Sequence, residues 1–262
     1  KEESLMRQIR NGLHGAGINV ENTKGEADAG QAEINVHYAD ALRMGDVHVM
    51  VKNAVKEIAF LNDRAITFLA KWHHDYAGSS SHIHQSLRRA DGEAVFFDPA
   101  QPHSMSKMMQ SYLAGLLTYA DDTTYFLAPY VNSYKRFKAG TFAPTKAIWS
   151  IDNRTAGYRV VAENSQNIRV ECRVGGSDLN PYLALASQLA AGLKGIEDNL
   201  TLEAEFTGDA YQADAARSIL ASLRDATVAL DQSKMLRAAM GDAVVDHCLL
   251  YTSPSPRDNR VS

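Results

Sequence analysis

The chain has 262 residues, of which 45% are hydrophobic and 22% are charged, and its formal net charge is −4. These values exclude a disordered, collagenous or low-complexity chain, and the slight acidity gives no reason to expect nucleic acid or an anionic membrane as a partner. The two cysteines suggest no disulfide framework, and no run of 18 apolar residues is present. We therefore expect a soluble cytoplasmic protein.

Hydrophobic periodicity predicts an α+β fold in which helices and strands follow each other at irregular intervals. Apolar positions every three or four residues predict helices over 2–14, 40–62, 104–120, 181–198 and onward to about 249. Alternating or short apolar segments predict strands over 31–37, 65–71, 81–87, 158–161 and 167–173. Residues 121–157 show no clear pattern and are expected to be irregular. No linker divides the chain.

The C-terminal end breaks the helical pattern that runs up to Asp246. The segment LLYTSPSPRDNRVS has two prolines and no periodicity, and it resembles translated sequencing-adapter read-through. A natural disordered tail is the alternative. We therefore predict a domain over residues 1–247, followed by a non-native tail over residues 248–262.

Two acids, Glu26 and Glu33, lie on either side of a glycine-containing turn in the segment GEADAGQAE. Together they could bind a hard divalent cation, because Mg²⁺ and Mn²⁺ prefer oxygen ligands. Spacing alone favours a pair of solvated surface acids, so this motif does not decide the function by itself.

Two histidines, His82 and His84, follow a Gly-Ser-rich segment, and on a strand both point to the same face. Two imidazoles on one face can ligate a metal or contact phosphate. A polar strand that faces water would have the same pattern.

A second charged strand carries Arg169, Glu171 and Arg173 on one face, alternating with Val170 and Cys172. The apolar set is expected to face a core, so the charged set faces either solvent or a cleft. Two arginines beside a glutamate could bind an anion and a metal together, because guanidinium groups pair with carboxylate and phosphate oxygens.

Basic residues gather in the stretch without clear structure and just after it. They are Lys135, Arg136, Lys138, Arg154 and Arg159. Loop arginines that converge on one site clamp phosphates and carboxylates, whereas scattered ones do not. With the acids and histidines they favour phosphoryl transfer from a nucleotide, in which metals and cations neutralise developing charge. No Walker A motif, kinase-type Gly-rich loop or Rossmann fingerprint occurs in the sequence.

The order of these motifs resembles the catalytic domain of the glutamine synthetase superfamily over about residues 4–246. The matching segments are GEADAGQAEIN, FLAKW, GSSSHIHQSL, APYVNSYKRF, FAP, DNRTAGYR, RVECR and NPYLALA. The resemblance implies a mostly antiparallel curved sheet flanked by helices. It also implies ATP-dependent ligation of an amine to the γ-carboxylate of glutamate through γ-glutamyl phosphate, in a homo-oligomeric ring.

The resemblance also assigns a role to each charged motif. It implies one Mg²⁺ or Mn²⁺ ion held by Glu26 and Glu33, and another held by His82 and Glu171. The implied ATP contacts are His84, Ser86, Arg154, Arg159 and Arg169. The implied glutamate contacts are Gly78, Arg136 and Arg173. Arg154, which would stabilise the transferring phosphoryl group, and Arg136 are the implied catalytic residues.

The chain departs from the family pattern at its start. The family supplies one more Glu to each metal from an upstream Glu-x-Glu strand, and a small N-terminal domain completes the active site of a neighbouring subunit. We expect this chain to begin after both, which puts the activity of the fragment alone in question.

Three substitutions bear on the nucleophile. Phe142 stands where glutamine synthetases proper carry a flap Glu, and Ala77 and Ser80 replace the Asn and second Gly of the family's NGSG loop. These departures resemble the γ-glutamyl-amine ligases of the superfamily, so an organic amine is the expected substrate beside glutamate. A true glutamine synthetase that uses ammonia and a non-catalytic regulatory relative are the alternatives.

Overall fold

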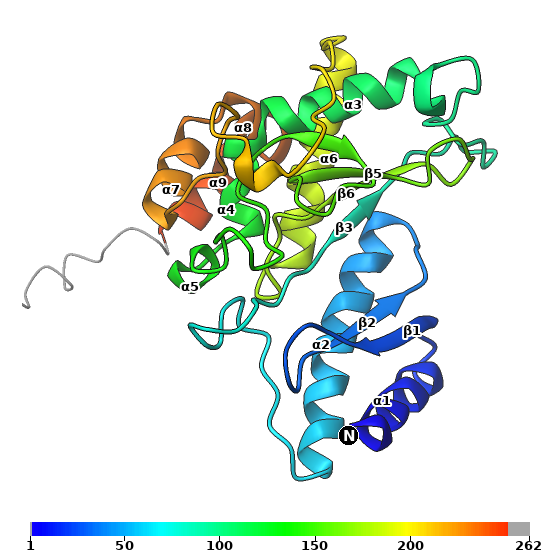
Figure 1. Ribbon diagram of the computed structural model, residues 1–262, viewed down its shortest axis with the longest axis vertical. Helices are drawn as coiled ribbons and strands as arrows, with labels where there is room; N and C mark the ends of the chain where they lie inside the picture. The colour runs from blue at the N-terminus through cyan, green and yellow to red at the C-terminus, as the bar shows by residue number, and fades with distance from the viewer. Residues whose placement is uncertain (1, 251–262) are drawn as a thin grey trace, which may run out of the picture.

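The computed structural model describes residues 2–250, which form two lobes (Figure 1). The N-terminal lobe, blue to cyan in Figure 1, lies below a larger body that contains the remaining elements. The elements of the N-terminal lobe are helix α1 (Glu3–Gly15), strands β1 (Val20–Gly25) and β2 (Ala32–Val36), and helix α2 (Ala41–Leu61).

Apolar side chains at helical spacing hold the N-terminal lobe together. Ile9 and Leu13 of α1 pack with Val47 and Val55 of α2, as the predicted amphipathic helices require. The side chain of Asp40 caps the first turn of α2. This lobe therefore has a small hydrophobic core of its own, separate from that of the larger body.

The strands form two sheets. In the N-terminal lobe β1 pairs antiparallel with β2. In the larger body the order is β3-β6-β5-β4, where β3 and β5 are antiparallel to β6 and β4 is parallel to β5. These strands are β3 (Ile83–Gln85), β4 (Trp149–Ile151), β5 (Tyr158–Val161) and β6 (Arg169–Cys172). The predicted α+β class with mostly antiparallel pairing is confirmed, although the strands are divided between two sheets.

Helices pack against the four-stranded sheet and supply much of the main core. They are α3 (Lys107–Thr118), α4 (Ala120–Leu127), α5 (Val131–Tyr134), α6 (Pro181–Glu197), α7 (Leu223–Gln232), α8 (Lys234–Met240) and α9 (Asp242–Leu250). Helices α3 and α6 cross closely at Gly115 and Gly195, where a Cβ on Gly195 would lie 2.2 Å from the Ser111 carbonyl oxygen. The absence of side chains at both glycines permits this approach.

The predicted strand over residues 65–71 is wrong, because this segment is an extended connection without strand pairing. Ile66 and Phe68 pack onto the core of the N-terminal lobe, while Leu69 is exposed. These apolar residues thus pack on one lobe without joining a sheet. The local sequence of such a segment looks the same as that of a buried strand.

The expectation of an irregular stretch over residues 121–157 is wrong in part, since the stretch contains most of α4, all of α5 and β4. Threonine has a weak helix preference, which hides α4 from a pattern search. In the folded chain the hydroxyl of Thr124 donates to the Ala120 carbonyl oxygen at 2.7 Å within the helix.

The two lobes meet where α2 packs against α6. The ring of Tyr182 covers Gly45, where a Cβ would come within 2.7 Å of the ring. The Tyr182 hydroxyl donates to Asp46 at 2.7 Å, and Lys52 donates to the Ser177 carbonyl oxygen at 2.8 Å.

The predicted domain boundary at residue 247 falls inside α9, which runs to Leu250. Residues 251–262 of the predicted non-native tail lie outside the described residues. Among the helices that are described, none is both long and apolar enough to cross a membrane.

Candidate active site

Strand β6 carries the centre of the charged cluster. Its Glu171 pairs across the sheet with Arg159 of β5 on one side and His84 of β3 on the other. Although Glu171 is only 3% exposed, its carboxylate lies 3.2 Å from Nη1 of Arg159 and 3.0 Å from Nη1 of Arg173. Nδ1 of His82 lies 3.1 Å from the same carboxylate. Strand alternation therefore brings the predicted residues together, as their spacing indicates.

The two faces of β6 differ as predicted. Val170 and Cys172 are fully buried in the main core. On the opposite face Arg169 donates from Nε to Nδ1 of His84 at 3.2 Å, and Arg173 is also buried. The charged face therefore packs against side chains of β3 and β5, and the alternative of a simple solvent face is excluded for Glu171 and Arg173.

Charges and burial set the protonation state of this cluster. Burial alone raises the pKa of Glu171, but the hydrogen bond with His82 and the charge of Arg173 outweigh it and hold this pKa well below its usual range. Burial lowers the pKa of His82, and burial lowers the pKa of His84 to about 4. At neutral pH the site thus holds an ionised carboxylate between guanidinium groups and two neutral imidazoles.

A neutral His82 beside an ionised Glu171 is a donor set that a divalent cation can use. With Nδ1 facing Glu171, the buried Nε2 of His82 has no hydrogen-bond partner among the described residues. Over residues 2–250 no three His, Cys, Asp or Glu side chains converge as a metal cluster, so the chain offers two donors here. The pair fits the metal position that the family resemblance implies, and this role stays a prediction.

Two buried arginines beside the cluster can receive an anion. Arg136 donates to the Val174 carbonyl oxygen, and Arg173 donates to Glu171. Within the described chain, the buried Nε of each guanidinium has no partner. Burial lowers the pKa of Arg136 to about 10, which still leaves it charged at neutral pH. Because buried charged donors without partners are costly, a carboxylate or phosphate that accepts from them is stabilised.

The backbone at Gly78 lies directly against Arg136. A Cβ at Gly78 would come within 2.4 Å of the Arg136 Cγ, so this position needs a residue without a side chain. The N-terminal lobe holds the same loop, because Gln31 donates to the Gly78 carbonyl oxygen at 3.0 Å and the Ala77 N–H donates to Asp28. The sequence does not single out Gln31 and Asp28 as contacts of this loop, because their position in the segment GEADAGQAE does not show which part of the chain they touch.

The turn between β1 and β2 brings Glu26 and Glu33 together, as predicted. Lys24 lies 3.5 Å from the Glu26 carboxylate and 3.3 Å from that of Glu33. The interaction with Glu33 raises the pKa of Glu26. Burial alone would raise the pKa of Glu33, but its interaction with Glu26 and the charge of Lys24 outweigh burial, so the pKa of Glu33 is lowered. Divalent cations prefer carboxylate oxygens, so the pair suits the other metal position that the family resemblance implies, and this role stays a prediction.

Two predicted residues are not joined to the cluster. Arg154 is exposed on the turn after β4, and among the described residues no hydrogen bond or ion pair links it to Glu171. Ser86 is exposed just beyond the end of β3. Asp152, which was not among the predicted residues, accepts from Nε of Arg159 at 2.9 Å and lies in the same DNR motif as Arg154.

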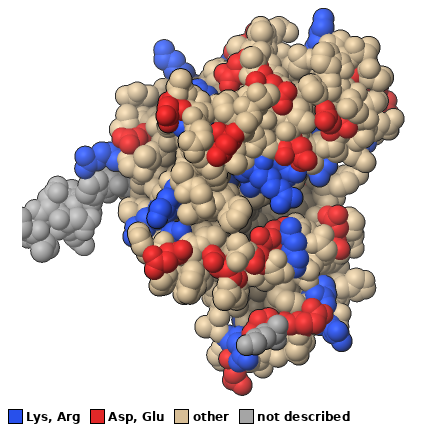
Figure 2. All heavy atoms as spheres, in the orientation of Figure 1, with Lys and Arg blue, Asp and Glu red and all other residues tan. Residues whose placement is uncertain are grey.

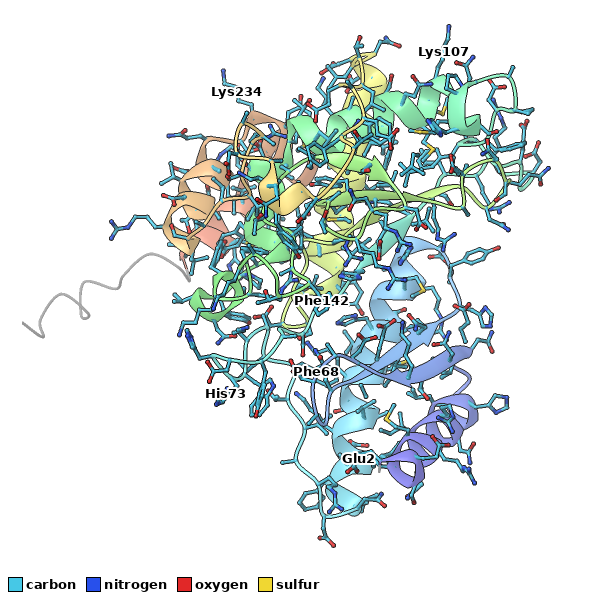
Figure 3. The ribbon with its side chains drawn as sticks, in the orientation of Figure 1. Glu2, Phe68, His73, Lys107, Phe142 and Lys234 are labelled. Atoms are coloured by element: carbon cyan, nitrogen blue, oxygen red, sulfur yellow. The ribbon has the colours of Figure 1, made fainter. Side chains whose placement is uncertain are left out.

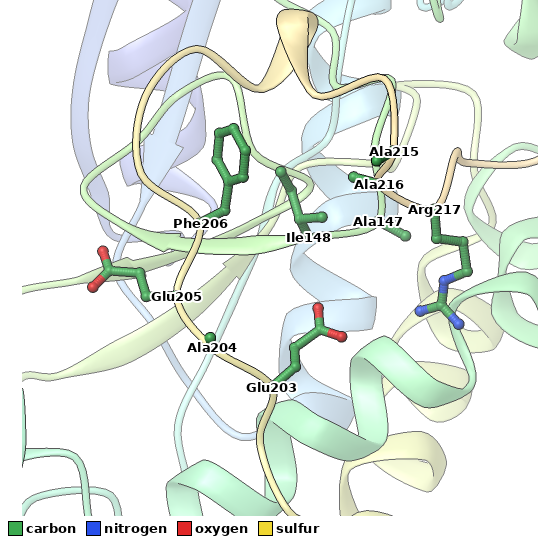
Figure 4. Close-up of a pocket in the computed structure, with 9 residues that line it drawn as sticks. All are labelled: Ala147, Ile148, Glu203, Ala204, Glu205, Phe206, Ala215, Ala216 and Arg217. Atoms are coloured by element: carbon green, nitrogen blue, oxygen red, sulfur yellow. The ribbon is translucent and has the colours of Figure 1, made fainter.

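Figure 2 shows a hollow between the larger body and the N-terminal lobe, with Lys and Arg side chains inside it and acidic side chains on the rim. A separate pocket of about 340 Å³ lies beside β4 (Figure 4). Its lining is Ala147, Ile148, Glu203, Ala204, Glu205, Phe206, Ala215, Ala216 and Arg217. None of these residues belongs to the charged cluster, so this pocket is not part of the candidate site, which we assign to the cluster around Glu171.

Comparison with known families matches residues 1–252 to the family described as glutamine synthetase, catalytic domain. The chain is 44% identical over 245 residues to gamma-glutamylethanolamide synthetase of Streptomyces coelicolor, covering 94% of this chain and 52% of that protein. It is 37% identical over 245 residues to glutamate–isopropylamine ligase of a Pseudomonas species, covering 93% of this chain and 53% of that protein.

A solved structure titled as a complex of GmaS with ADP superimposes on the chain with a TM-score of 0.89 and 28% identity. The match covers 99% of this chain and 61% of that chain. The chain thus spans about half the length of the curated relatives it matches.

Proposed function

Because the chain belongs to the glutamine synthetase catalytic-domain family, we propose that the protein uses ATP to ligate an organic amine to the γ-carboxylate of glutamate. γ-Glutamyl phosphate is the proposed intermediate, and Mg²⁺ or Mn²⁺ is the proposed metal. The names of two relatives, a gamma-glutamylethanolamide synthetase and a glutamate–isopropylamine ligase, support an organic amine.

One observation carries this proposal. Among residues 2–250 the Nε atoms of the buried Arg136 and Arg173 have no hydrogen-bond partner, and Arg173 shares its ion pair with the Glu171–His82 donor set. An anion pocket and a metal donor pair therefore adjoin one another. Activation of a carboxylate by ATP needs this combination, because both the carboxylate and the phosphates bring negative charge to one place.

In the first proposed step, Arg136 and Arg173 hold glutamate against the backbone at Gly78. An oxygen of the γ-carboxylate attacks the γ-phosphorus of ATP, the bond to the β-γ bridging oxygen breaks, and ADP leaves. Arg159 and Arg169 are proposed to contact the ATP phosphates, with Arg154 on the transferring phosphoryl group. The metals, when held by the acidic and histidine donors, supply neutralisation of phosphate charge.

In the second step the amine, as the free base, attacks the acyl carbon of γ-glutamyl phosphate. Phosphate leaves with the electrons of the anhydride bond, and the new amide nitrogen loses one proton. Phe142 is 68% exposed and lies at the edge of the body toward the N-terminal lobe (Figure 3). Its ring offers an apolar and π surface to an alkylammonium group but no carboxylate for ammonium, which supports the organic amine.

We further propose that the protein is cytoplasmic and assembles as a homo-oligomeric ring. The family resemblance supports this assembly. Large apolar side chains exposed on the N-terminal lobe also support it, because such surface is usually covered by a partner. They include Tyr38, Leu42, Phe60 and Leu61.

The proposal is tested with the full-length protein, glutamate, ATP and Mg²⁺ by measuring phosphate release with ethanolamine, isopropylamine, ammonium and hydroxylamine. We expect kcat/KM for at least one of the two organic amines to exceed that for ammonium by about tenfold or more. Hydroxylamine should trap the acyl phosphate as γ-glutamyl hydroxamate.

A pair of variants makes this test specific to the site. Glu171→Gln keeps the shape but removes the charge between the arginines, and we expect turnover to fall by about 100-fold. Glu197→Gln, a change of an exposed acid paired with Lys194 on α6, should leave turnover unchanged. Equal turnover with ammonium would support a glutamine synthetase instead, and no phosphate release with any amine would support the regulatory alternative.

A further inference from the structure

Three aromatic side chains cluster on the loop that precedes Gly78. The ring centroids of Trp72 and Tyr76 are 5.4 Å apart, and that of His73 lies 5.4 Å from Trp72 and 4.7 Å from Tyr76. Trp72 is 49% exposed and Tyr76 is 40% exposed. These rings, which we call the aromatic triad, offer π surface to solvent and do not pack into either core.

The loop that carries the aromatic triad is fixed from both sides. Lys71 is buried, and its ammonium group donates to the Tyr76 carbonyl oxygen, which closes the loop on itself. The Lys71 N–H donates to the Asn132 side chain at 2.9 Å, and Asn132 donates back to the Lys71 carbonyl oxygen at 2.8 Å. Asp28 of the N-terminal lobe accepts from the Ala77 N–H at the other end. The backbone of the loop that carries the rings is therefore fixed before any ligand arrives.

The aromatic triad borders the proposed glutamate pocket. Gly78 follows the loop after one residue, and its backbone touches the side-chain stem of Arg136. Figure 3 shows His73 on the segment that passes between the two lobes. Because the loop leads directly into the backbone that lies against Arg136, a ligand on the rings would lie on the segment that enters the proposed glutamate pocket.

The chemistry of the aromatic triad suits an alkylammonium ion. Aromatic faces attract organic cations and also cover their methylene groups. The carboxylate of Asp75 lies 4.0 Å from Nδ1 of His73 and is largely exposed, so it adds negative charge beside the rings. Glutamate and ATP carry net negative charge, which the carboxylate of Asp75 disfavours on this surface.

We propose that Trp72, His73 and Tyr76, with Asp75, form the binding surface for the organic amine, taken as a small primary alkylammonium ion. This inference rests on the proposed function and names the residues that select its second substrate. Here the rings recognise the carbon part of the amine, which ammonium lacks.

The first test compares Trp72→Ala with Val228→Ala in the full-length protein, using ethanolamine and hydroxylamine as nucleophiles. Val228 is an exposed apolar residue on α7, outside the triad and outside the N-terminal lobe. Trp72→Ala should raise the KM for ethanolamine by about tenfold relative to the KM for hydroxylamine, and Trp72→Phe should reverse most of this increase. Val228→Ala should change neither KM. Equal increases in both KM values, or a change only in oligomer mass, would overturn the inference.

The second test measures binding directly. Trp149 is 5% exposed and Trp72 is 49% exposed, so a ligand on the triad should change the fluorescence of Trp72. Titration of the wild-type protein with ethanolamine should give a saturable change that is absent in Trp72→Phe. Wild-type protein that forms no hydroxamate contradicts the proposed function, whereas hydroxamate formation without this fluorescence change contradicts only the aromatic triad as the amine site.

Discussion

At the scale of single residues, His48 on α2 predicts how stability depends on pH. Its Nε2 is buried without a hydrogen-bond partner among the described residues. Burial, together with a smaller effect of the charge of Lys52, lowers the pKa of His48 to about 4. The unfolded chain, with a pKa near the ordinary 6.5, then takes up a proton before the folded one. The stability that comes from keeping His48 neutral is therefore fully present above pH 6.5, and the free energy of unfolding falls by about 3 kcal/mol as the pH approaches 4.

Urea unfolding of wild type and His48→Gln at pH 8, 6.5 and 5 checks this prediction. The variant should lose less stability than wild type between pH 6.5 and 5, because glutamine takes up no proton. His37→Gln, a change at an exposed histidine, serves as the control and should follow wild type. Parallel curves for His48→Gln and wild type would contradict the prediction.

Single residues also show which contacts can be predicted from the sequence. Alternation along one strand is enough to predict that Glu171 and its flanking arginines share a face opposite Val170 and Cys172. The contacts of Asp28 and Gln31 with the loop at Gly78 join segments almost 50 residues apart in the chain. No local sequence pattern predicts these contacts, because they depend on how the N-terminal lobe packs against the larger body.

At the scale of elements, the crossing of α3 and α6 depends on glycine. A Cβ at Gly195 would lie 2.2 Å from the Ser111 carbonyl oxygen and 2.6 Å from the Gly115 Cα, and backbone atoms of a helix cannot move aside locally. Gly195→Ala gains about 1 kcal/mol of helix propensity. Overpacking against backbone should exceed this gain and leave the protein less stable by about 2 kcal/mol.

The measurement is the free energy of unfolding in urea, with Gly12→Ala as the matched control. A Cβ at Gly12 would meet only the flexible end of Ile58, at 2.7 Å, so this change in α1 should be nearly neutral. Equal stability of both variants would mean that α3 and α6 can separate without cost.

Elements differ in how well they can be predicted. Helices α1, α2, α3 and α6 have clear apolar spacing, and the structure confirms them within a few residues. Strand β1 has the polar sequence VENTKG and is formed through its pairing with β2, which no periodicity reveals. The same limit explains residues 65–71, where an apolar run packs on a lobe without pairing.

At the scale of the whole molecule, the candidate ligands come from both lobes. Glu26 and Glu33 belong to the N-terminal lobe, and Glu171 belongs to the body. Their relative position therefore depends on the α2–α6 contact, since each lobe has its own core. Separate cores joined by the α2–α6 contact and a few hydrogen bonds predict that the lobes differ in local stability.

Tyr182→Ala tests this prediction, because it removes the ring that covers Gly45 and the hydrogen bond to Asp46. We expect amide hydrogens of α1 and α2 to exchange about tenfold faster, while those of α3 keep their rates. Tyr182→Phe removes only the hydrogen bond to an exposed carboxylate and should have a smaller effect. Equal acceleration of exchange in α3 would contradict the prediction, because it would show that the two lobes unfold as one cooperative unit. The α2–α6 contact would then not be what sets the distance between the two candidate metal positions.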